Sequence, residues 1–169
     1  MVDIKEHHFK ELLKKDSVEF YFYLKTILFP LVIKLESLVA KLIQSRFPEL
    51  YSSFNVNLPY IETYLSFFKS FAINIGLQED QKGNEIRQGT TDPHKDTNDC
   101  LYAFCVIIVF GNFKGGDLNL DEIGIVMEIQ GGYMILFRSS LLNHFNSLVL
   151  DGKRFSIVFY LRKFIYNEI

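Results

Sequence analysis

The sequence contains no tryptophan, only two cysteines and only four prolines among its 169 residues. The two cysteines, Cys100 and Cys105, have an odd spacing that places them on opposite faces of a strand, which argues against a disulfide between them. Without a wider Cys/His cluster they also make no structural zinc site. Reduced thiols are typical of the cytoplasm and the nucleus, so we expect an intracellular protein.

The sequence also has little net charge and no long apolar run. The formal net charge is −2, which gives no overall electrostatic attraction to nucleic acid. The most apolar stretch, residues 18–33, is interrupted by Glu19, Lys25 and Pro30, whereas a membrane helix needs about 20 mostly apolar residues. The charged first residues argue against a signal peptide. We therefore expect no membrane partner.

Aromatic residues are abundant, with 17 Phe and 9 Tyr in a chain that is 49% hydrophobic. Such a chain can bury a core, and its length suits a single domain over residues 1–169. Residues 1–69 are expected to be mainly helical, with one helix over 3–15 and another over 31–46. Glu36 is placed on the polar face of the second helix. The opposite, apolar face is predicted from helical spacing to contain Leu31, Leu35, Leu38, Val39, Leu42 and Ile43.

Residues 70–169 have the character of a β-rich core. Alternating apolar positions and many β-branched and aromatic residues predict strands over 70–76, 101–110, 117–120, 123–129, 133–137 and 154–161. Turns are expected at 111–116 and 151–152. Several short strands at regular spacing are typical of a sandwich or a barrel. The polar stretch 77–92 is either a lid over a site or a solvated connection.

Two histidines and a carboxylate form the main candidate site. If residues 92–97 run as a strand, His94 and Asp96 point to the same side, because side chains alternate with a period of two. His144, far downstream, is the candidate for a third ligand. Two histidines and one carboxylate on one face of a metal form the facial triad of non-haem Fe(II) oxygenases. A surface pair at 94–96 and a core histidine at 144 are the alternative interpretations.

A second candidate site follows in the last predicted strand. Arg154 and Ser156 share one face of this alternating, mostly apolar segment. A guanidinium in such surroundings favours a carboxylate partner, which it can bind through two parallel hydrogen bonds. The partner is either the carboxylate of a ligand or that of a structural ion pair.

These features resemble the Fe(II)/2-oxoglutarate-dependent dioxygenases, in which a His-x-Asp pair, a distal His and an Arg-x-Ser occur in this order. The local sequence is similar to the TET/JBP-like branch, and especially to its fungal members. The resemblance covers about residues 70–162. It is carried by five ordered segments: Phe71-Ala72-Ile73-Asn74-Ile75-Gly76, His94-Lys95-Asp96-Thr97-Asn98-Asp99-Cys100, Gly111-Asn112-Phe113-Lys114-Gly115-Gly116-Asp117-Leu118, Phe137-Arg138-Ser139-Ser140-Leu141-Leu142-Asn143-His144 and Arg154-Phe155-Ser156.

The resemblance implies a fold, a cofactor and a reaction. The fold would be α+β, with a double-stranded β-helix (jelly-roll) core and N-terminal helices packed on one sheet. His94, Asp96 and His144 would bind Fe(II). Arg154 and Ser156 would bind the far carboxylate of 2-oxoglutarate, which is consumed with O2 and released as succinate and CO2 while the substrate is oxidised.

The resemblance also implies a substrate region, with DNA or RNA carrying a methylated pyrimidine as the expected substrate. Asn98, Asp99 and Arg138 are the candidate substrate-binding residues. The TET-like enzymes carry an Asn at the position of Asp99, where it contacts the flipped base. Asp99 either accepts a hydrogen bond from a base or caps a turn. Arg138 either contacts the substrate or 2-oxoglutarate, or anchors a phosphate, or is a surface residue at a strand end.

Two alternative functions stay open at this point. The first is a 2-oxoglutarate oxygenase that acts on a protein side chain or a small metabolite, which the acidic pI of about 6.1 and the small size favour. The second is a non-catalytic jelly-roll binding module that retains the metal site. The cysteine-rich zinc region of the animal TET enzymes is absent from this sequence, and no basic run is present to grip a nucleotide.

Overall fold

The computed structural model describes residues 26, 28–54, 65, 67–75, 78–79, 85–86 and 91–163. The chain divides into two compact units, residues 1–71 and 72–169. The expected helix over 3–15 lies outside the described residues. The organisation as a single domain, with helices packed on one sheet, stays a prediction.

The described part of the first unit contains two helices, α3 (Phe29–Arg46) and α4 (Pro48–Phe54). Pro30 lies in the first turn of α3, where a missing N–H costs nothing. The helix predicted over 31–46 is therefore present, but the predicted apolar face is only partly right, because Leu31, Leu38 and Leu42 are exposed. The buried face consists of five residues, of which Val39 and Ile43 were predicted: Val32, Glu36, Val39, Ala40 and Ile43.

Glu36 was predicted on the polar face of α3 and lies on its buried face instead. Its side chain is fully buried, and its Oε1 accepts hydrogen bonds from the backbone N–H groups of Phe67 (2.6 Å) and Phe68 (3.2 Å). A buried carboxylate is tolerated only where hydrogen bonds replace its water. The acceptor of these two N–H groups is thus a residue that was predicted to face solvent. Helical periodicity cannot reveal such a contact, because Phe67 and Phe68 lie outside the helix.

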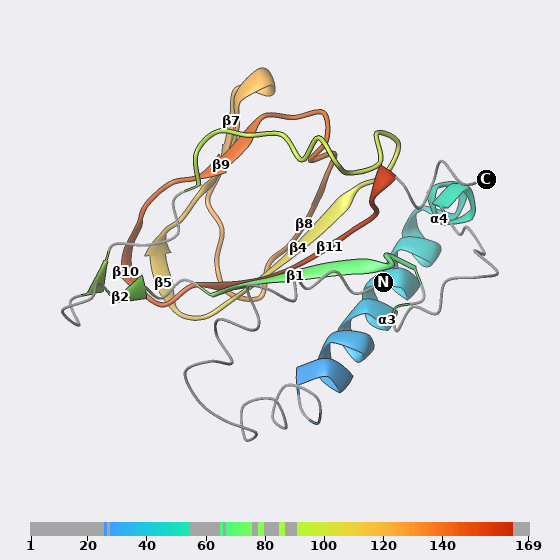
Figure 1. Cartoon of the computed structure of the whole chain (residues 1–169), viewed down its shortest axis with the longest axis horizontal. Coiled ribbons are helices and arrows are strands. Elements are labelled where there is room, and N and C mark those ends of the chain that lie inside the picture. Colours follow the sequence, from blue (N-terminus) through green and yellow to red (C-terminus); the bar gives the residue numbers. More distant parts are fainter. Residues whose placement is uncertain are drawn as a thin grey trace. The chain divides into compact units, whose positions relative to one another are not determined.

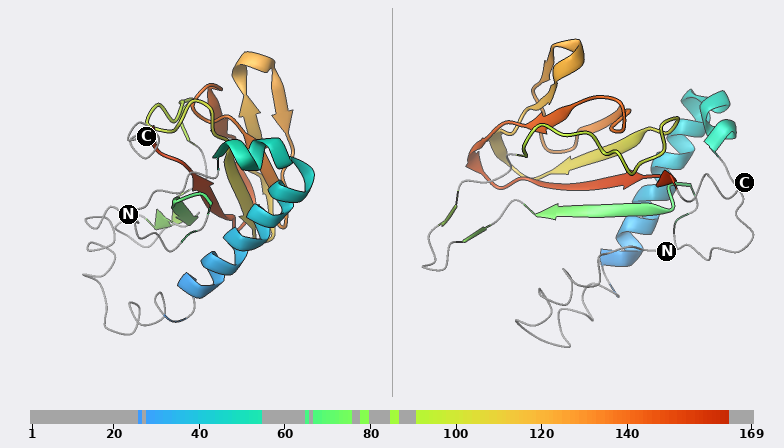
Figure 2. Two further views of the ribbon diagram at one scale, coloured as in Figure 1. Left: turned by 90° about the vertical axis from the view of Figure 1, so that its right-hand side faces the viewer. Right: turned by 45° about the horizontal axis from the view of Figure 1, so that its top comes forward.

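The second unit is built from antiparallel strands (Figures 1 and 2). A four-stranded sheet has the order β1-β11-β4-β8 and a three-stranded sheet the order β7-β6-β9, while β10 pairs with β5 and β2 with β3. The strands and one 3-10 helix have these bounds: β1 Ser70–Ile75, β2 Gln78–Glu79, β3 Glu85–Ile86, β4 Cys105–Phe110, β5 Phe113–Gly115, β6 Leu118–Leu120, η2 Asp121–Ile123, β7 Ile125–Met127, β8 Met134–Phe137, β9 His144–Asn146, β10 Val149–Gly152 and β11 Phe155–Tyr160.

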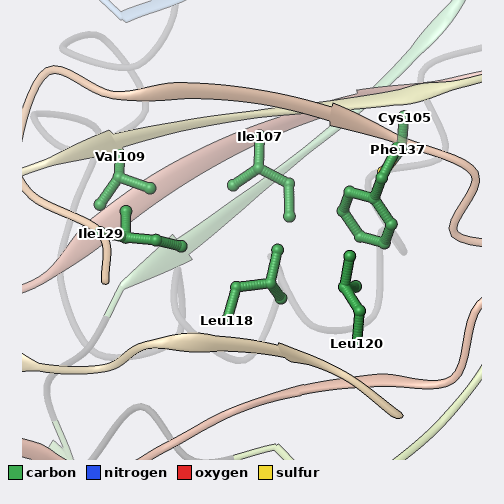
Figure 3. Packing of buried hydrophobic residues seen from close by; sticks show 7 residues of the cluster. All are labelled: Cys105, Ile107, Val109, Leu118, Leu120, Ile129 and Phe137. Atoms are coloured by element: carbon green, nitrogen blue, oxygen red, sulfur yellow. The ribbon is translucent and has the colours of Figure 1, made fainter. Parts of the chain in front are cut away.

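The core of the second unit lies between the two larger sheets. Ile107 of β4 points toward Leu118 of β6, Val109 lies opposite Ile129, and Phe137 lies opposite Leu120 (Figure 3). The alternate residue, Ile108, belongs to the opposite side of β4 and is also buried, so this strand is covered on both faces. The whole cluster consists of seven buried side chains: Cys105, Ile107, Val109, Leu118, Leu120, Ile129 and Phe137.

Several predicted boundaries are wrong for identifiable reasons. Residues 92–97 form no regular strand, because the backbone turns after Lys95, where the N–H of Thr97 donates to its carbonyl. Residues 101–104 precede β4, with a turn at 101–102. The predicted turn at 151–152 belongs to β10, which pairs with β5 rather than forming a hairpin with β11.

The described residues thus form a mixed α+β structure, mostly antiparallel sheet with few helices, which is compatible with a jelly-roll-like fold. Within the stretch 77–92, predicted to be a loop, the described residues form the short ladder of β2 and β3. Its role as a lid stays a prediction. None of the described helices is long and apolar enough to cross a membrane.

Candidate metal centre

Backbone pairing brings the two histidines of the candidate site together. His94 and His144 face each other in an isolated antiparallel bridge, in which the N–H of His94 donates to the His144 carbonyl (3.1 Å) and the N–H of His144 to the His94 carbonyl (2.9 Å). Their ring centroids are 4.4 Å apart. The hydroxyl of Thr91 accepts the N–H of Asn146 (3.0 Å), which ties the same two segments together again.

A turn places the carboxylate beside the two imidazoles. The N–H of Asp96 donates to the carbonyl of Ser139 (2.9 Å), and the N–H of Asp99 donates to the carbonyl of Asp96 (2.8 Å). His94 Nε2 lies 3.8 Å from Asp96 Oδ1, and His144 Nε2 lies 3.7 Å from Asp96 Oδ2. Both separations are too long for hydrogen bonds, although the ligand atoms of the three residues all lie within 4.8 Å of one another.

The other ring nitrogens fix which nitrogen each imidazole offers. His94 Nδ1 is 2.7 Å from the Asp92 carbonyl, and His144 Nδ1 is 2.9 Å from the Leu142 carbonyl. A carbonyl oxygen only accepts, so in both rings Nδ1 carries the hydrogen and Nε2 of a neutral ring carries a lone pair. Metal-bound histidines are oriented in this way by their second nitrogen.

Electrostatics favour a neutral His144. Burial lowers the pKa of His144 below its usual value, while the nearby Asp96 carboxylate opposes this shift. The ring also meets Phe137 edge to face, with centroids 4.9 Å apart. A neutral imidazole is the form that binds a metal, so these surroundings suit a ligand.

Asp99 is half-buried beside the candidate ligands. Burial and the neighbouring Asp96 carboxylate raise its pKa to about 7, while a hydrogen bond from the Ser139 hydroxyl (3.3 Å) opposes the rise. Near neutral pH this carboxyl is therefore partly protonated and can donate as well as accept a hydrogen bond. Asn98 is exposed, and its carbonyl accepts the N–H of Lys163 (3.0 Å).

Arg154 is buried at the entry to β11. Its Nε has no hydrogen-bond partner among the residues that the structure describes, and its guanidinium carbon lies 6.0 Å from the centre of the Phe113 ring. Burial lowers the pKa of this guanidinium, which nevertheless stays protonated because arginine begins so high. A buried, incompletely satisfied guanidinium matches an anionic ligand such as a carboxylate.

Two further predicted residues have contacts within the protein. The Ser156 hydroxyl is buried and accepts a hydrogen bond from Asn74 Nδ2 (3.3 Å). Arg138 Nη2 donates to the Leu101 carbonyl (2.7 Å), and its guanidinium carbon lies 6.0 Å from the Phe104 ring centre. Arg138 thus holds the turn that follows Asp99, whatever further role it has.

Glu122 also lies beside this site, although it was not predicted. Its Oε1 lies 2.6 Å from Lys95 Nζ, and its Oε2 accepts the N–H of Asn143 at 2.5 Å. The hydrogen bond from Lys95 lowers the pKa of Glu122. No sequence motif marks this residue, because its partners are distant in the chain. The pairing of β6 with β9 brings Asn143 near it, and the bridge between His94 and His144 brings Lys95 near it.

Comparisons with known proteins give a match among solved structures. No protein-family model matches the sequence, and a search of curated proteins finds no match. The structure is similar to that of NgTET1 in complex with 5mC DNA, with 27% sequence identity over 87% of this chain and a TM-score of 0.57. The fold is TET-like. The chain spans about half of NgTET1, 53% of the length of that chain.

The candidate centre also fits a metal chemically. Two imidazole nitrogens with free lone pairs and one carboxylate are a donor set that suits Fe(II). His94, Asp96 and His144 could therefore hold a metal ion.

Proposed function

We propose that this protein is an Fe(II)- and 2-oxoglutarate-dependent dioxygenase with a double-stranded β-helix core, of the TET/JBP-like kind. The convergence of His94, Asp96 and His144 carries the proposal. Their ligand atoms all lie within 4.8 Å of one another, although His144 is far from His94 and Asp96 in the sequence. Bound Fe(II), with 2-oxoglutarate and O2, supplies the oxidising chemistry, in which 2-oxoglutarate becomes succinate and CO2.

Within this proposal each side chain has a stated task. His94 and His144 offer Nε2 because their Nδ1 hydrogens are engaged by backbone carbonyls. Asp96 offers a carboxylate oxygen from a turn that is fixed by the Ser139 carbonyl. Arg154 binds the far carboxylate of 2-oxoglutarate in a buried position where a charge-assisted hydrogen bond is strong. The Ser156 hydroxyl, which already accepts from Asn74, can donate a second hydrogen bond to that carboxylate.

The proposed substrate is a methylated pyrimidine in nucleic acid. The similar structure of NgTET1 is a complex with 5mC DNA, which supports DNA as the partner. Asn98 and Asp99 are the proposed substrate contacts, and Asp99 suits a base edge because a carboxyl with a pKa of about 7 both donates and accepts hydrogen bonds. Arg138 supports this region by holding the Leu101 carbonyl.

An anaerobic titration tests the metal and cosubstrate sites. Metal-free protein is titrated with Fe(II) and then with 2-oxoglutarate, while the weak visible charge-transfer band of a chelated keto acid is recorded. We expect the band in the native protein and no band in Asp96→Ala or His144→Ala. Arg154→Ala should need a higher 2-oxoglutarate concentration, whereas Lys153→Ala, which removes an exposed neighbouring charge, should not. A folded native protein without the band would refute the proposal.

A second experiment tests the substrate. Succinate release is measured with a 5mC duplex, with the same duplex carrying unmodified cytosine, and with a peptide mixture. Release above background only with the 5mC duplex supports the proposed substrate. Release with peptides alone would overturn it and favour an oxygenase of protein side chains. A charge-transfer band without turnover of any substrate would favour a binding module.

A further inference from the structure

Glu122 connects the two chain segments that carry the candidate metal ligands. One carboxylate oxygen reaches Lys95, and the other accepts the N–H of Asn143. Lys95 stands between His94 and Asp96, and Asn143 directly precedes His144. A single side chain therefore contacts the immediate neighbours of all three candidate ligands.

The backbone around Glu122 strengthens this connection. The N–H of Asp121 donates to the Asn143 carbonyl (3.0 Å), and Asp121 Oδ2 accepts from Asn143 Nδ2 (3.1 Å). Asn143 is thus held on its N–H, its carbonyl and its side chain by two adjacent residues. These lie in η2 at the tip that joins β6 to β7, drawn in light orange in Figures 1 and 2.

The contact with Lys95 lets Glu122 restrict the segment that carries His94 and Asp96. Lys95 lies outside any regular strand, so fewer ladder hydrogen bonds fix its backbone than would fix a residue within a sheet. Anchoring its side chain to η2 limits rotation of the short segment that must present His94 and Asp96 to one point. Partners that hydrogen-bond a metal ligand directly change metal affinity by about 10- to 100-fold, and Glu122, which contacts the neighbours of the ligands, is expected at the lower end of this range.

We propose that Glu122 is a positioning residue that clamps the segments around Lys95 and Asn143 and thereby holds the three metal ligands in register. The inference rests on the proposed function, because it concerns the same metal centre. It does not concern global stability. Lys95 and Glu122 are 41% and 38% exposed, and exposed ion pairs contribute little to stability.

Titration of the metal-free protein with Co(II) alone tests the inference, with the visible absorption of bound Co(II) as the readout. We expect Glu122→Ala to weaken Co(II) binding about 10-fold. Glu122→Gln keeps an acceptor for Asn143 but loses the charge opposite Lys95, so its loss should be smaller. Lys95→Met should weaken binding as well. Glu128→Ala, which removes an exposed carboxylate of the same hairpin region, is the matched control and should bind like the native protein.

The outcomes separate this inference from the proposed function. A native protein that binds no Co(II) refutes the metal centre itself. Unchanged Co(II) affinity in Glu122→Ala, or an equal loss in Glu128→Ala, overturns the positioning role while leaving the centre intact. Thermal unfolding of the metal-free variants should match that of the native protein. If Glu122→Ala does not fold, Glu122→Gln and Lys95→Met decide, and native affinity in both overturns the inference.

Discussion

At the scale of single residues, the hydrogen bonds that each side chain already makes determine which of its atoms remain available to a ligand. His94 and His144 each use Nδ1 for a backbone carbonyl, which leaves Nε2 for a metal. Arg154 has the opposite condition, because its Nε lacks a partner among the described residues. Buried polar groups without partners are costly in native proteins and often mark a ligand position.

Gly116 controls the space around Arg154. A Cβ added to Gly116 would lie 3.0 Å from Arg154 Cδ and 3.1 Å from Val149 Cγ2, and the φ of Gly116 is +72°. We expect Gly116→Ala to cost about 1 to 2 kcal/mol of stability from the backbone conformation and also to displace Arg154, which should weaken 2-oxoglutarate binding. Unfolding in urea and calorimetric titration with 2-oxoglutarate measure the two effects.

Gly132 provides the control for this variant. Its φ of +92° is also left-handed, but an added Cβ would meet nothing within 4 Å. Gly132→Ala should therefore lower stability and leave 2-oxoglutarate affinity unchanged. Equal affinities in the two alanine variants would contradict a role for Gly116 in placing Arg154.

Substitutions of Glu36 test whether its hydrogen bonds or apolar packing stabilise the buried face of α3. Its carboxylate accepts the N–H groups of Phe67 and Phe68, so Glu36→Leu removes the acceptor from two buried donors. A buried donor left unsatisfied costs about 1 to 3 kcal/mol. Glu36→Gln keeps an acceptor oxygen and should lose less. Urea unfolding of the two variants checks this order, and a more stable Leu variant would show that apolar packing outweighs the hydrogen bonds.

At the scale of elements, strand β4 protects its cysteine. Cys105 is buried within the core, and burial raises the pKa of its thiol to about 12. Since the thiolate is the reactive form, we expect iodoacetamide to leave native Cys105 unmodified at pH 8 and to modify it in urea, as detected by mass spectrometry. Leu150→Cys, at a position that is 74% exposed, should react at once. Rapid native labelling of Cys105 would mean that β4 opens easily.

Elements with strong periodicity could be predicted from the sequence, whereas elements held by distant partners could not. The β-branched and aromatic run predicted β4 and β11, and the apolar spacing predicted α3 to within two residues of its start. The buried face of α3 was predicted only in part: Val39 and Ile43 are buried as expected, whereas Glu36 is buried because its carboxylate accepts two N–H groups that are distant in sequence. The segment of His94 was expected to be a strand, and it forms only a single bridge.

The candidate site shows the same division between local and distant signals. His94, Asp96 and His144 were proposed together from residue type and order, and the structure brings their ligand atoms together. Their backbone anchors, Ser139 and Glu122, were not identified as such. Ser139 contributes a carbonyl, which every residue has, and the partners of Glu122 are distant in sequence. Such contacts depend on sheet register rather than on local pattern.

At the scale of the whole molecule, the candidate centre belongs to one unit only. All three ligands lie in the unit of residues 72–169, and α3 lies in the unit of residues 1–71. A metal that binds the folded state stabilises it by about 2.7 kcal/mol at 100 times its dissociation constant. In this chain we expect the metal to stabilise mainly the segments that carry its three ligands.

Hydrogen exchange tests where the metal acts. We expect 100-fold excess Co(II) over its dissociation constant to slow exchange in peptides covering residues 91–100 and 141–147, because the metal links His94 and Asp96 to His144. Peptides from α3 should exchange at unchanged rates and serve as the internal control. In Asp96→Ala the slowing should disappear. Equal protection of α3 would mean instead that the two units open together and that the metal stabilises the chain as one cooperative body.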